Sequence, residues 1–319
     1  MRRRHQFELI QSLRQFFQDK GFLETLTPPM VPNPGMETHV HPFQVMSAKD
    51  KSFRPFYLHT SPEFCLKELL SEHASEGLSN IYSLSYCFRD EPESPIHRSQ
   101  FLMLEWYRLH HRYETIMDDT EKLIQWCLDK TPAPVRAEIK NQKMTRVTME
   151  ELWLETIKRN PLDFLDAKDL RTLIQKDFPE VPLPSVELAW DDLFFLLHLN
   201  KVETHLKNWP LLLVKEFPAP LAALSTIKAT DARVCERFEV YVNGIELCNA
   251  YNELTDVSEQ RRRFKLQAQE KKHIYNYELP EPTRFLESLE RGMPPASGIA
   301  LGVERLLHSL FDVENPFFY

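Results

Sequence analysis

The feature that most constrains the fold is a predicted β-hairpin around the dipeptide Asn243-Gly244. This dipeptide separates two short runs rich in β-branched and aromatic residues, 238–242 and 245–248. Both central positions of a two-residue hairpin turn need a positive φ, which asparagine and glycine adopt more readily than other residues. Because a hairpin joins neighbouring antiparallel strands, the sequence predicts an antiparallel sheet.

Helical patterns flank this hairpin without regular alternation between strands and helices. Apolar residues at helical spacing predict helices over residues 5–20, with Gly21 as the cap, and over residues 113–129. The apolar run 211–214 predicts a buried strand, and residues 298–302 predict another strand that leads into a helix. This arrangement is typical of an α+β domain with an antiparallel sheet.

Glycine is too scarce for the common loops that bind phosphate through the backbone. The chain has seven glycines in 319 residues, and neither GxGxxG nor GxxxxGK[ST] occurs. The Rossmann and P-loop routes to a nucleotide are therefore excluded. If the protein handles ATP, side chains must hold it.

Composition narrows the class of protein further. A hydrophobic content of 42% is sufficient for a large core, and no run approaches the roughly 18 apolar residues that cross a bilayer. The net charge of −8 argues against nucleic acid as the main partner, because phosphate binding usually needs a basic surface. Five scattered cysteines without CxxC spacing favour reduced thiols, so we expect a cytoplasmic protein.

Three charged clusters are candidates for a catalytic site, and each is ambiguous alone. They occupy residues 87–107, 244–256 and 298–305. In the first cluster, Arg-x-Glu is commonly a surface ion pair. In the second, the odd spacing of Glu246 and Glu253 places them on opposite faces of an ideal strand, unless the strand ends or bends between them.

Together and in this order, the clusters resemble motifs 2 and 3 of class II aminoacyl-tRNA synthetases, and specifically those of the lysyl subgroup. Residues 27–30, Thr-Pro-Pro-Met, resemble motif 1, whose proline lies at the dimer interface in that family. Residues 60–63, Thr-Ser-Pro-Glu, resemble the segment that holds the substrate amino group. The resemblance covers about residues 5–312 and implies a homodimer.

Within this family, the chain is most similar to the truncated lysyl paralogues, the elongation factor P–(R)-β-lysine ligases. Motif 1 begins almost at residue 1, so we expect one class II catalytic domain over residues 1–319, with an antiparallel sheet flanked by helices and no anticodon-binding domain. Ala300 matches the paralogues, whereas enzymes that charge tRNA usually have glycine there. Such a methyl group changes discrimination by only about 1–3 kcal/mol.

The resemblance implies an ATP site. Arg89 and Arg305 are the implied catalytic residues: Arg89 contacts the α-phosphate and the substrate carboxylate, and Arg305 with His97 holds the outer phosphates. Glu91 accepts a hydrogen bond from the adenine amino group, and Phe101 stacks on the ring. The other implied ATP-binding residues are Asp90, Arg98, Glu246, Leu247 and Gly302. Glu246 and Glu253 are the implied ligands of Mg²⁺, which prefers oxygen donors.

The resemblance also implies a pocket for a substrate with two ammonium groups. Glu63 takes one ammonium, and Tyr107 and Glu259 are candidates for the other, with Glu105 nearby. The remaining implied substrate-binding residues are Ser61, Pro62, Glu253 and Ala300. The implied reaction activates lysine or β-lysine as an aminoacyl-adenylate and transfers it to a lysine of elongation factor P, with neither tRNA nor a membrane as a partner.

One departure from the family keeps two alternatives open. Where the family has His-Asn-Pro-Glu-Phe, residues 97–101 read His-Arg-Ser-Gln-Phe. The chain is then either a truncated enzyme that acylates tRNA or another amine, or a catalytically silent regulatory paralogue. Retention of Arg89, Glu246, Glu253 and Arg305 weighs against the silent paralogue.

Overall fold

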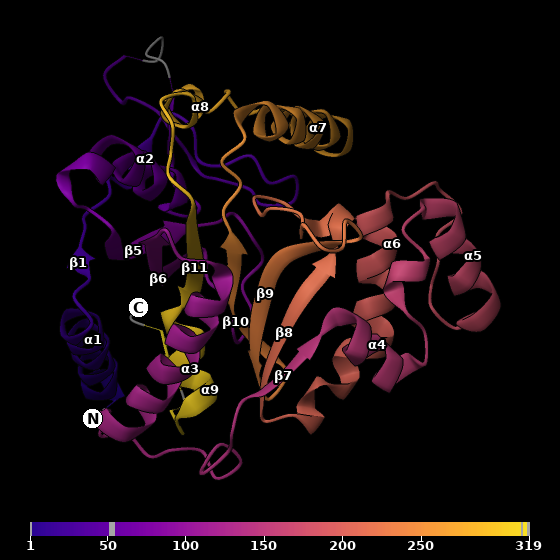
Figure 1. Cartoon of the computed structure of the whole chain (residues 1–319), viewed down its shortest axis with the longest axis horizontal. Coiled ribbons are helices and arrows are strands. Elements are labelled where there is room, and N and C mark those ends of the chain that lie inside the picture. The colour runs from indigo at the N-terminus through magenta and orange to yellow at the C-terminus, as the bar shows by residue number, and fades with distance from the viewer. Residues whose placement is uncertain (1, 51–54, 314, 318–319) are drawn as a thin grey trace. The chain divides into compact units, whose positions relative to one another are not determined.

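The computed structural model describes residues 2–50, 55–313 and 315–317, which belong to two compact units (Figure 1). The first unit combines residues 1–133, 253–308 and 313–319, and the second combines residues 134–252 and 309–312. The single catalytic domain over residues 1–319 stays a prediction.

The first unit contains a sheet in which three long strands run antiparallel. Its strand order is β1-β5-β6-β11, and β1 pairs in parallel with β5. The bounds are β1 Leu23–Glu24, β5 Asn80–Phe88, β6 Gln100–Leu109 and β11 Ala296–Gly302. A small sheet has the order β2-β4-β3, with β2 Met30–Val31, β4 Phe56–Leu58 and β3 Gln44–Val45.

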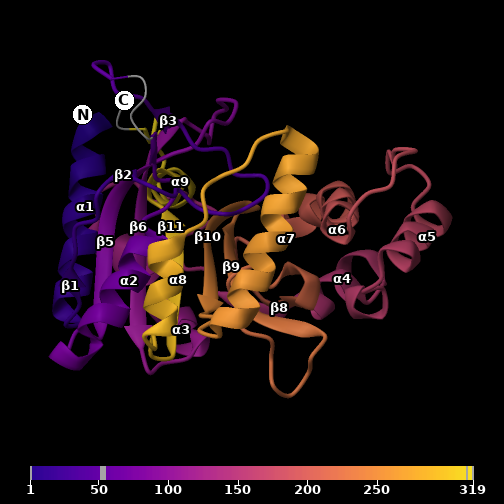
Figure 2. The same cartoon turned by 90° about the horizontal axis from the view of Figure 1, so that it is seen from above.

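Helices accompany this sheet. They are α1 Arg2–Asp19, α2 Glu63–His73, α3 Tyr113–Lys130, α7 Val257–Tyr275, α8 Thr283–Glu290 and α9 Val303–Leu310, with a 3₁₀ turn at Ala74–Glu76. Figures 1 and 2 both show α2 and α8 side by side. Phe64 of α2 stacks on Phe285 of α8 with ring centroids 4.5 Å apart. This stacking holds the start of α2 next to α8.

The predicted first helix and its cap are confirmed, although the helix begins three residues earlier than expected. Leu13 and Phe17 are fully buried, and the Phe17 ring stacks on Tyr82 of β5 at 4.5 Å. Gly21 has a φ of +73°, and the Phe22 amide donates to the Phe17 carbonyl at 3.0 Å. The left-handed residue therefore ends the helix as glycine caps do.

The second unit has its own sheet and core. Its strand order is β10-β9-β8-β7, antiparallel except for the β8–β7 pair. The elements are β7 Thr145–Thr148, β8 Leu211–Pro218, β9 Val234–Val242, β10 Ile245–Asn252, α4 Met149–Ile157, α5 Ala167–Asp177 and α6 Trp190–Leu197. Short helical turns are Pro161–Asp163, His198–Val202, Glu203–Asn208 and Ala219–Leu221. Trp153 and Phe194 stack at 4.9 Å inside its core. The α+β class with mostly antiparallel strands is confirmed.

The predicted hairpin is confirmed and joins β9 to β10. Asn243 and Gly244 have φ values of +50° and +81°, as a primed turn requires. The pairing of β10 is irregular between Glu246 and Cys248, and the strand ends at Asn252, directly before Glu253. Strict alternation of faces therefore does not extend from Glu246 to Glu253.

Among the described residues, no helix has both the length and the apolar character needed to cross a membrane.

Replacing Gly244 with alanine should destabilise the hairpin. An alanine at φ +81° costs about 1–2 kcal/mol, and its Cβ would lie 3.3 Å from Lys207 Cγ. Gly21→Ala is the matched control, because its φ is also positive but its Cβ would meet no atom within 4 Å. Urea denaturation should show a larger loss for Gly244→Ala. An equal or larger loss of stability for Gly21→Ala would contradict the assignment of a tight turn at Asn243-Gly244.

Candidate active site

The register of β6 and β11 defines the floor of the candidate site. Gly298 pairs with Tyr107, and Ala300 pairs with Glu105. Because side chains two residues apart in a strand share a face, these four residues belong to one surface. Glu105 and Tyr107 are buried, whereas Ala300 keeps some exposure. Ala300 therefore lies on the same face of the sheet as Glu105 and Tyr107, and its role in substrate binding stays a prediction.

Glu105 is a fully buried carboxylate with two hydroxyl donors. Ser61 Oγ donates to its Oε1 at 2.5 Å, and the Tyr107 hydroxyl donates to its Oε2 at 3.1 Å. The same Ser61 Oγ accepts a hydrogen bond from the amide of Glu63 at 3.1 Å, which links the start of α2 to Glu105. Burial, and then the charge of Glu63, raises the pKa of Glu105 to about 8.

Glu63 and Glu253 share one buried lysine, Lys67. The Lys67 Nζ donates to Glu63 Oε1 at 2.5 Å and lies 2.5 Å from Glu253 Oε2. Glu253 Oε2 is buried, and Lys67 is its direct cationic partner. Burial raises the pKa of Glu253 to about 8, although the charge of Lys67 lowers it. Lys67 is therefore a cation shared by both carboxylates.

Gly298 leaves the space that these groups occupy. A Cβ at this position would lie 2.2 Å from Tyr107 Cε1 and 2.7 Å from Glu253 Oε1. Real Cβ atoms do not approach other atoms so closely, so the ring and the carboxylate can hold their places only beside glycine.

Arg89 and Phe101 lie close together at the facing ends of β5 and β6. The Arg89 guanidinium lies 5.3 Å from the centre of the Phe101 ring, and its Nε donates to the carbonyl of Thr60 at 3.4 Å. Thr60 directly precedes Ser61, so the guanidinium lies beside the segment that carries the Glu105 donor. The predicted contacts of Arg89 and Phe101 with phosphate and adenine remain predictions.

Arg305 and His97 meet across a long sequence separation. Arg305 Nη2 donates to His97 Nε2 at 2.8 Å, and His97 Nδ1 lies 2.7 Å from Ser94 Oγ. Because a guanidinium can only donate, Nε2 accepts and the ring proton is on Nδ1. Burial and the charge of Arg305 lower the pKa of His97, which favours the neutral imidazole.

Arg98 is used within its own loop. Its Nη1 donates to the carbonyls of Ser94 and His97, the latter at 2.8 Å, and its guanidinium lies 4.2 Å from the centre of the Phe317 ring. These contacts favour a role in ordering the loop over the predicted contact with ATP.

Asp90, which follows Arg89, is exposed, and its amide donates to the carbonyl of His41 at 2.7 Å. Glu91 is half-buried.

Glu304 connects α9 to β6. Both of its carboxylate oxygens accept from the amide of Leu102, at 2.9 and 3.0 Å, and burial raises its pKa to about 7. This contact holds the start of the helix that carries Arg305. At Gly302, a Cβ would make only ordinary contacts with Arg305, the nearest at 3.6 Å. The predicted role of Gly302 in binding ATP stays a prediction.

Glu259, a predicted substrate-binding residue, is already paired within its own helix. The Glu259 carboxylate accepts from Arg262 at 2.7 Å and from Arg263 at 2.8 Å, which lowers its pKa to about 2. A substrate ammonium would have to compete with both arginines, so the geometry favours Glu105 and Glu253 over Glu259. Glu246 and Leu247 lie on β10 in the second unit. Their roles remain predictions, as does that of Pro62, the residue before α2.

Sequence analysis missed two charged residues of the site. Lys67 could have been found, because it follows Glu63 by four residues and so lies on the same face of α2. Glu37 has no recognisable signal in the sequence. Burial and the charge of Glu63 raise its pKa, and the charge of Arg89 lowers it. A Cβ on Gly35 would lie 2.6 Å from Glu37 Oε2, so glycine makes room for this carboxylate.

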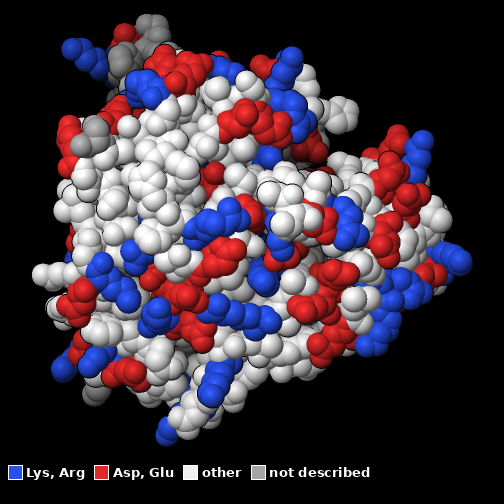
Figure 3. All heavy atoms as spheres, viewed as in Figure 1, with Lys and Arg blue, Asp and Glu red and all other residues white. Residues whose placement is uncertain are grey.

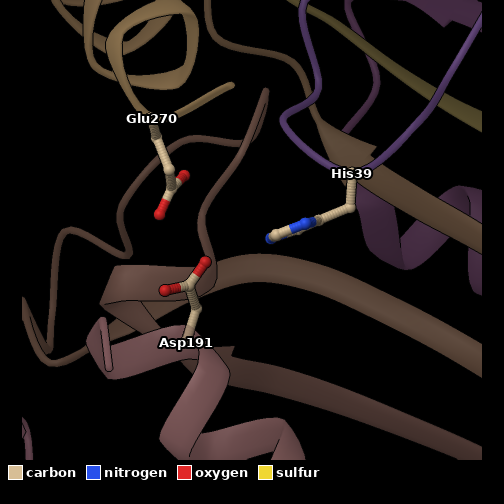
Figure 4. Close-up of side chains that lie close together, drawn as sticks. All are labelled: His39, Asp191 and Glu270. Carbon is tan, nitrogen blue, oxygen red and sulfur yellow. The ribbon is translucent and has the colours of Figure 1, made fainter. Parts of the chain in front are cut away.

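Figure 4 shows three side chains with groups that can bind metals, His39, Asp191 and Glu270. His39 and Glu270 belong to the first unit, where Glu270 accepts a hydrogen bond from Thr38 at 2.8 Å. Asp191 belongs to the second unit. We therefore assign no metal centre to these residues.

Comparison with known proteins identifies the relatives of this chain. Residues 2–315 match the family described as tRNA synthetases class II (D, K and N). The chain is 34% identical to an elongation factor P–(R)-β-lysine ligase of Proteus mirabilis, over 97% of this chain and 90% of that protein. It is 34% identical to the ligase of Edwardsiella ictaluri, over 96% and 90%, and 35% identical to that of Erwinia tasmaniensis, over 94% and 87%.

Gly298→Ala should weaken the binding of ammonium ligands. The new methyl group must displace Tyr107 or Glu253, which we expect to weaken the binding of L-lysine by more than about tenfold, or 1.4 kcal/mol. Isothermal titration calorimetry measures this loss. Gly77→Ala is the control, because a Cβ there meets no atom within 4 Å. Unchanged affinity in Gly298→Ala would contradict the geometry.

Lysine binding should strengthen as the pH rises from about 6 to about 8. Glu105, with a pKa of about 8, holds a proton at neutral pH, and this proton must leave before the carboxylate pairs with an ammonium group. Binding at pH 7 should therefore release protons, which calorimetry detects as a dependence of the enthalpy on the buffer. Glu105→Gln should reduce the release. Proton uptake on binding would contradict this pKa direction.

Proposed function

The chain belongs to the class II tRNA synthetase family (D, K and N), and from that premise we propose that it activates lysine or (R)-β-lysine with ATP and transfers it to a lysine side chain of elongation factor P. The names of its relatives supply the acceptor and the substrate class. The observation that carries the proposal is the cluster of Glu63, Glu105 and Glu253, which lies beside Ser61 and Tyr107. Glu105 and Glu253 are buried, and Glu63 is half-buried.

The cluster favours a substrate with two ammonium groups. Buried carboxylates are costly unless cations or hydrogen-bond donors satisfy them. Only Lys67 offers an ammonium to this cluster among the described residues, so a substrate must supply the rest. An analogue that lacks one ammonium would leave a buried carboxylate unpaired, and such sites reject the incomplete ligand strongly.

In the first step, an oxygen of the substrate carboxylate attacks the α-phosphorus of ATP, and pyrophosphate leaves. Arg89 is the proposed contact of both reacting groups, because its guanidinium lies beside Thr60 and Phe101. Arg305 carries the charge for the outer phosphates, and neutral His97 accepts its Nη2 hydrogen bond. Fixed cations of this kind stabilise the negative charge that develops during phosphoryl transfer.

In the second step, the ε-amine of an elongation factor P lysine attacks the acyl carbonyl, forms the amide and releases AMP. The attacking amine must first lose a proton. From an unperturbed pKa near 10.4 to pH 7, this costs about 4–5 kcal/mol. The carboxylates of the pocket are committed to the substrate ammonium groups, so we assign none of them as the base.

Mg²⁺ is the metal expected from the family, and Glu253 does not fit it. Its Oε2 lies 2.5 Å from the Lys67 ammonium, which would repel a divalent cation at the same oxygen. We therefore derive no step through Mg²⁺ and favour the role of Glu253 as an ammonium acceptor. The role of Glu246 as a metal ligand stays a prediction.

We propose a homodimer because apolar side chains are exposed around motif 1. Leu26, just before Thr27-Pro28, is 88% exposed, and Leu23 is 55% exposed.

A role in binding tRNA has no comparable support. On the face drawn in Figure 3, basic and acidic side chains are interspersed. In the basic run of α7, Arg261 pairs with Glu281 and Glu290.

ATP–pyrophosphate exchange and the mass of elongation factor P test the proposed function. Wild-type protein should catalyse exchange with lysine or (R)-β-lysine, and elongation factor P should gain the corresponding acyl mass. Arg89→Ala should slow exchange by about 10²–10³-fold through the loss of a charge that stabilises the transition state. Arg112→Ala, which changes an exposed arginine, is the control. No exchange with either amino acid would overturn the proposal, and acylation of tRNA instead would redirect it.

A further inference from the structure

Lys67 occupies a position that few lysines adopt. It is 1% exposed, in a protein interior where an unpaired ammonium is strongly unfavourable. Its Nζ contacts Glu63 from the same helix and Glu253 from a segment 186 residues away in the sequence. The ammonium also lies 5.8 Å from the centre of the Phe285 ring on α8. Three elements therefore hold this cation in one place.

Stabilising α2 does not require this arrangement. A Glu–Lys pair spaced by four residues stabilises a helix equally well on its surface, without desolvation. Buried ion pairs are often no more stable than apolar side chains of similar size, so burial of Lys67 is weak evidence for a role in stability. Both of its partners are residues assigned above to the substrate ammonium groups. The position of Lys67 therefore favours a role in the substrate pocket.

We propose that Lys67 is a positioning residue that sets the charge of the substrate pocket to match a diammonium substrate. This inference rests on the proposed function and deepens it. Three carboxylates, Glu63, Glu105 and Glu253, face one ammonium, which leaves two negative charges when all are ionised. Lysine and β-lysine each bring two ammonium groups.

Removing the Lys67 charge would change what the pocket accepts. The remaining carboxylates would repel one another and take up protons in place of substrate. The titratable groups that face Lys67 are Glu63 on α2, Glu253 before α7, and Glu105 with Tyr107 on β6. Loss of the cation should raise the pKa of Glu253, whose pairing with Lys67 is direct. Substrate would then bind well only at higher pH.

The test compares Lys67→Met, Lys67→Arg and the control Lys272→Met. Lys272 is an exposed lysine on α7 that also pairs with a glutamate. The KM values for lysine and ATP in ATP–pyrophosphate exchange, and the pH profile of kcat/KM for lysine, are measured for each protein, with lysine binding followed by calorimetry. Lys67→Met should raise the KM for lysine by at least about tenfold at pH 7. This is the effect of a rise of one unit in the pKa of a carboxylate that must be ionised to bind the substrate. The KM for ATP should be unchanged.

The acidic limb of the pH profile separates this role from a structural one. It should move to higher pH in Lys67→Met and stay in place in Lys67→Arg, which keeps the charge. If Lys67→Met does not fold, a limb that moves in Lys67→Arg would overturn the inference, and an unmoved limb would support it. A folded Lys67→Met with the profile of Lys272→Met would overturn it and leave the proposed function intact. Wild-type protein that neither binds nor activates lysine or β-lysine would overturn both.

Discussion

The cost of burying carboxylates is the constraint on which the candidate site depends. Glu105 and Glu253 are both withdrawn from water, and burial raises the pKa of each to about 8. Hydroxyl groups of Ser61 and Tyr107 partly satisfy Glu105, and Lys67 partly neutralises Glu253. Both carboxylates therefore still favour contact with a cation. In the proposed function the ammonium groups of the substrate meet this preference, and the free protein is less stable for burying the carboxylates without them.

The surrounding fold keeps these side chains in place through rigid elements. The pairing of β6 with β11 fixes Glu105 and Tyr107 against Gly298 and Ala300, and glycine at 298 leaves the room that the ring and Glu253 need. On the other side, α2 begins at Glu63 and is held by the stacking of Phe64 on α8. A site carried by strands and helix ends is more accurately positioned than one carried by loops.

Local sequence patterns were sufficient for the parts of the fold that local physics decides. The Asn243-Gly244 turn and the Gly21 cap follow from backbone preferences, and the helix over 113–129 follows from apolar spacing. The family resemblance, in turn, selected Glu63, Glu105 and Tyr107, which lie together in the structure. The sequence could not show that Glu259 is held by two arginines, because those contacts depend on side-chain geometry.

Lys67 and Glu37 were not assigned to the site from the sequence for a related reason. Lys67 looks like half of an ordinary helical ion pair until the chain returns with Glu253, a contact between segments 186 residues apart. Glu37 follows a glycine whose importance depends on the close approach of that carboxylate. Buried charge is a property of three-dimensional packing, so a single sequence contains little information about it.

A crystal structure with a non-hydrolysable lysyl-adenylate analogue would test the ammonium pocket most directly. The account predicts the ε-ammonium nitrogen within about 3 Å of a carboxylate oxygen of Glu105 or Glu253, with Lys67 still bridging Glu63 and Glu253. An analogue bound with its side chain outside this pocket, or bound only after Lys67 has left both carboxylates, would contradict it.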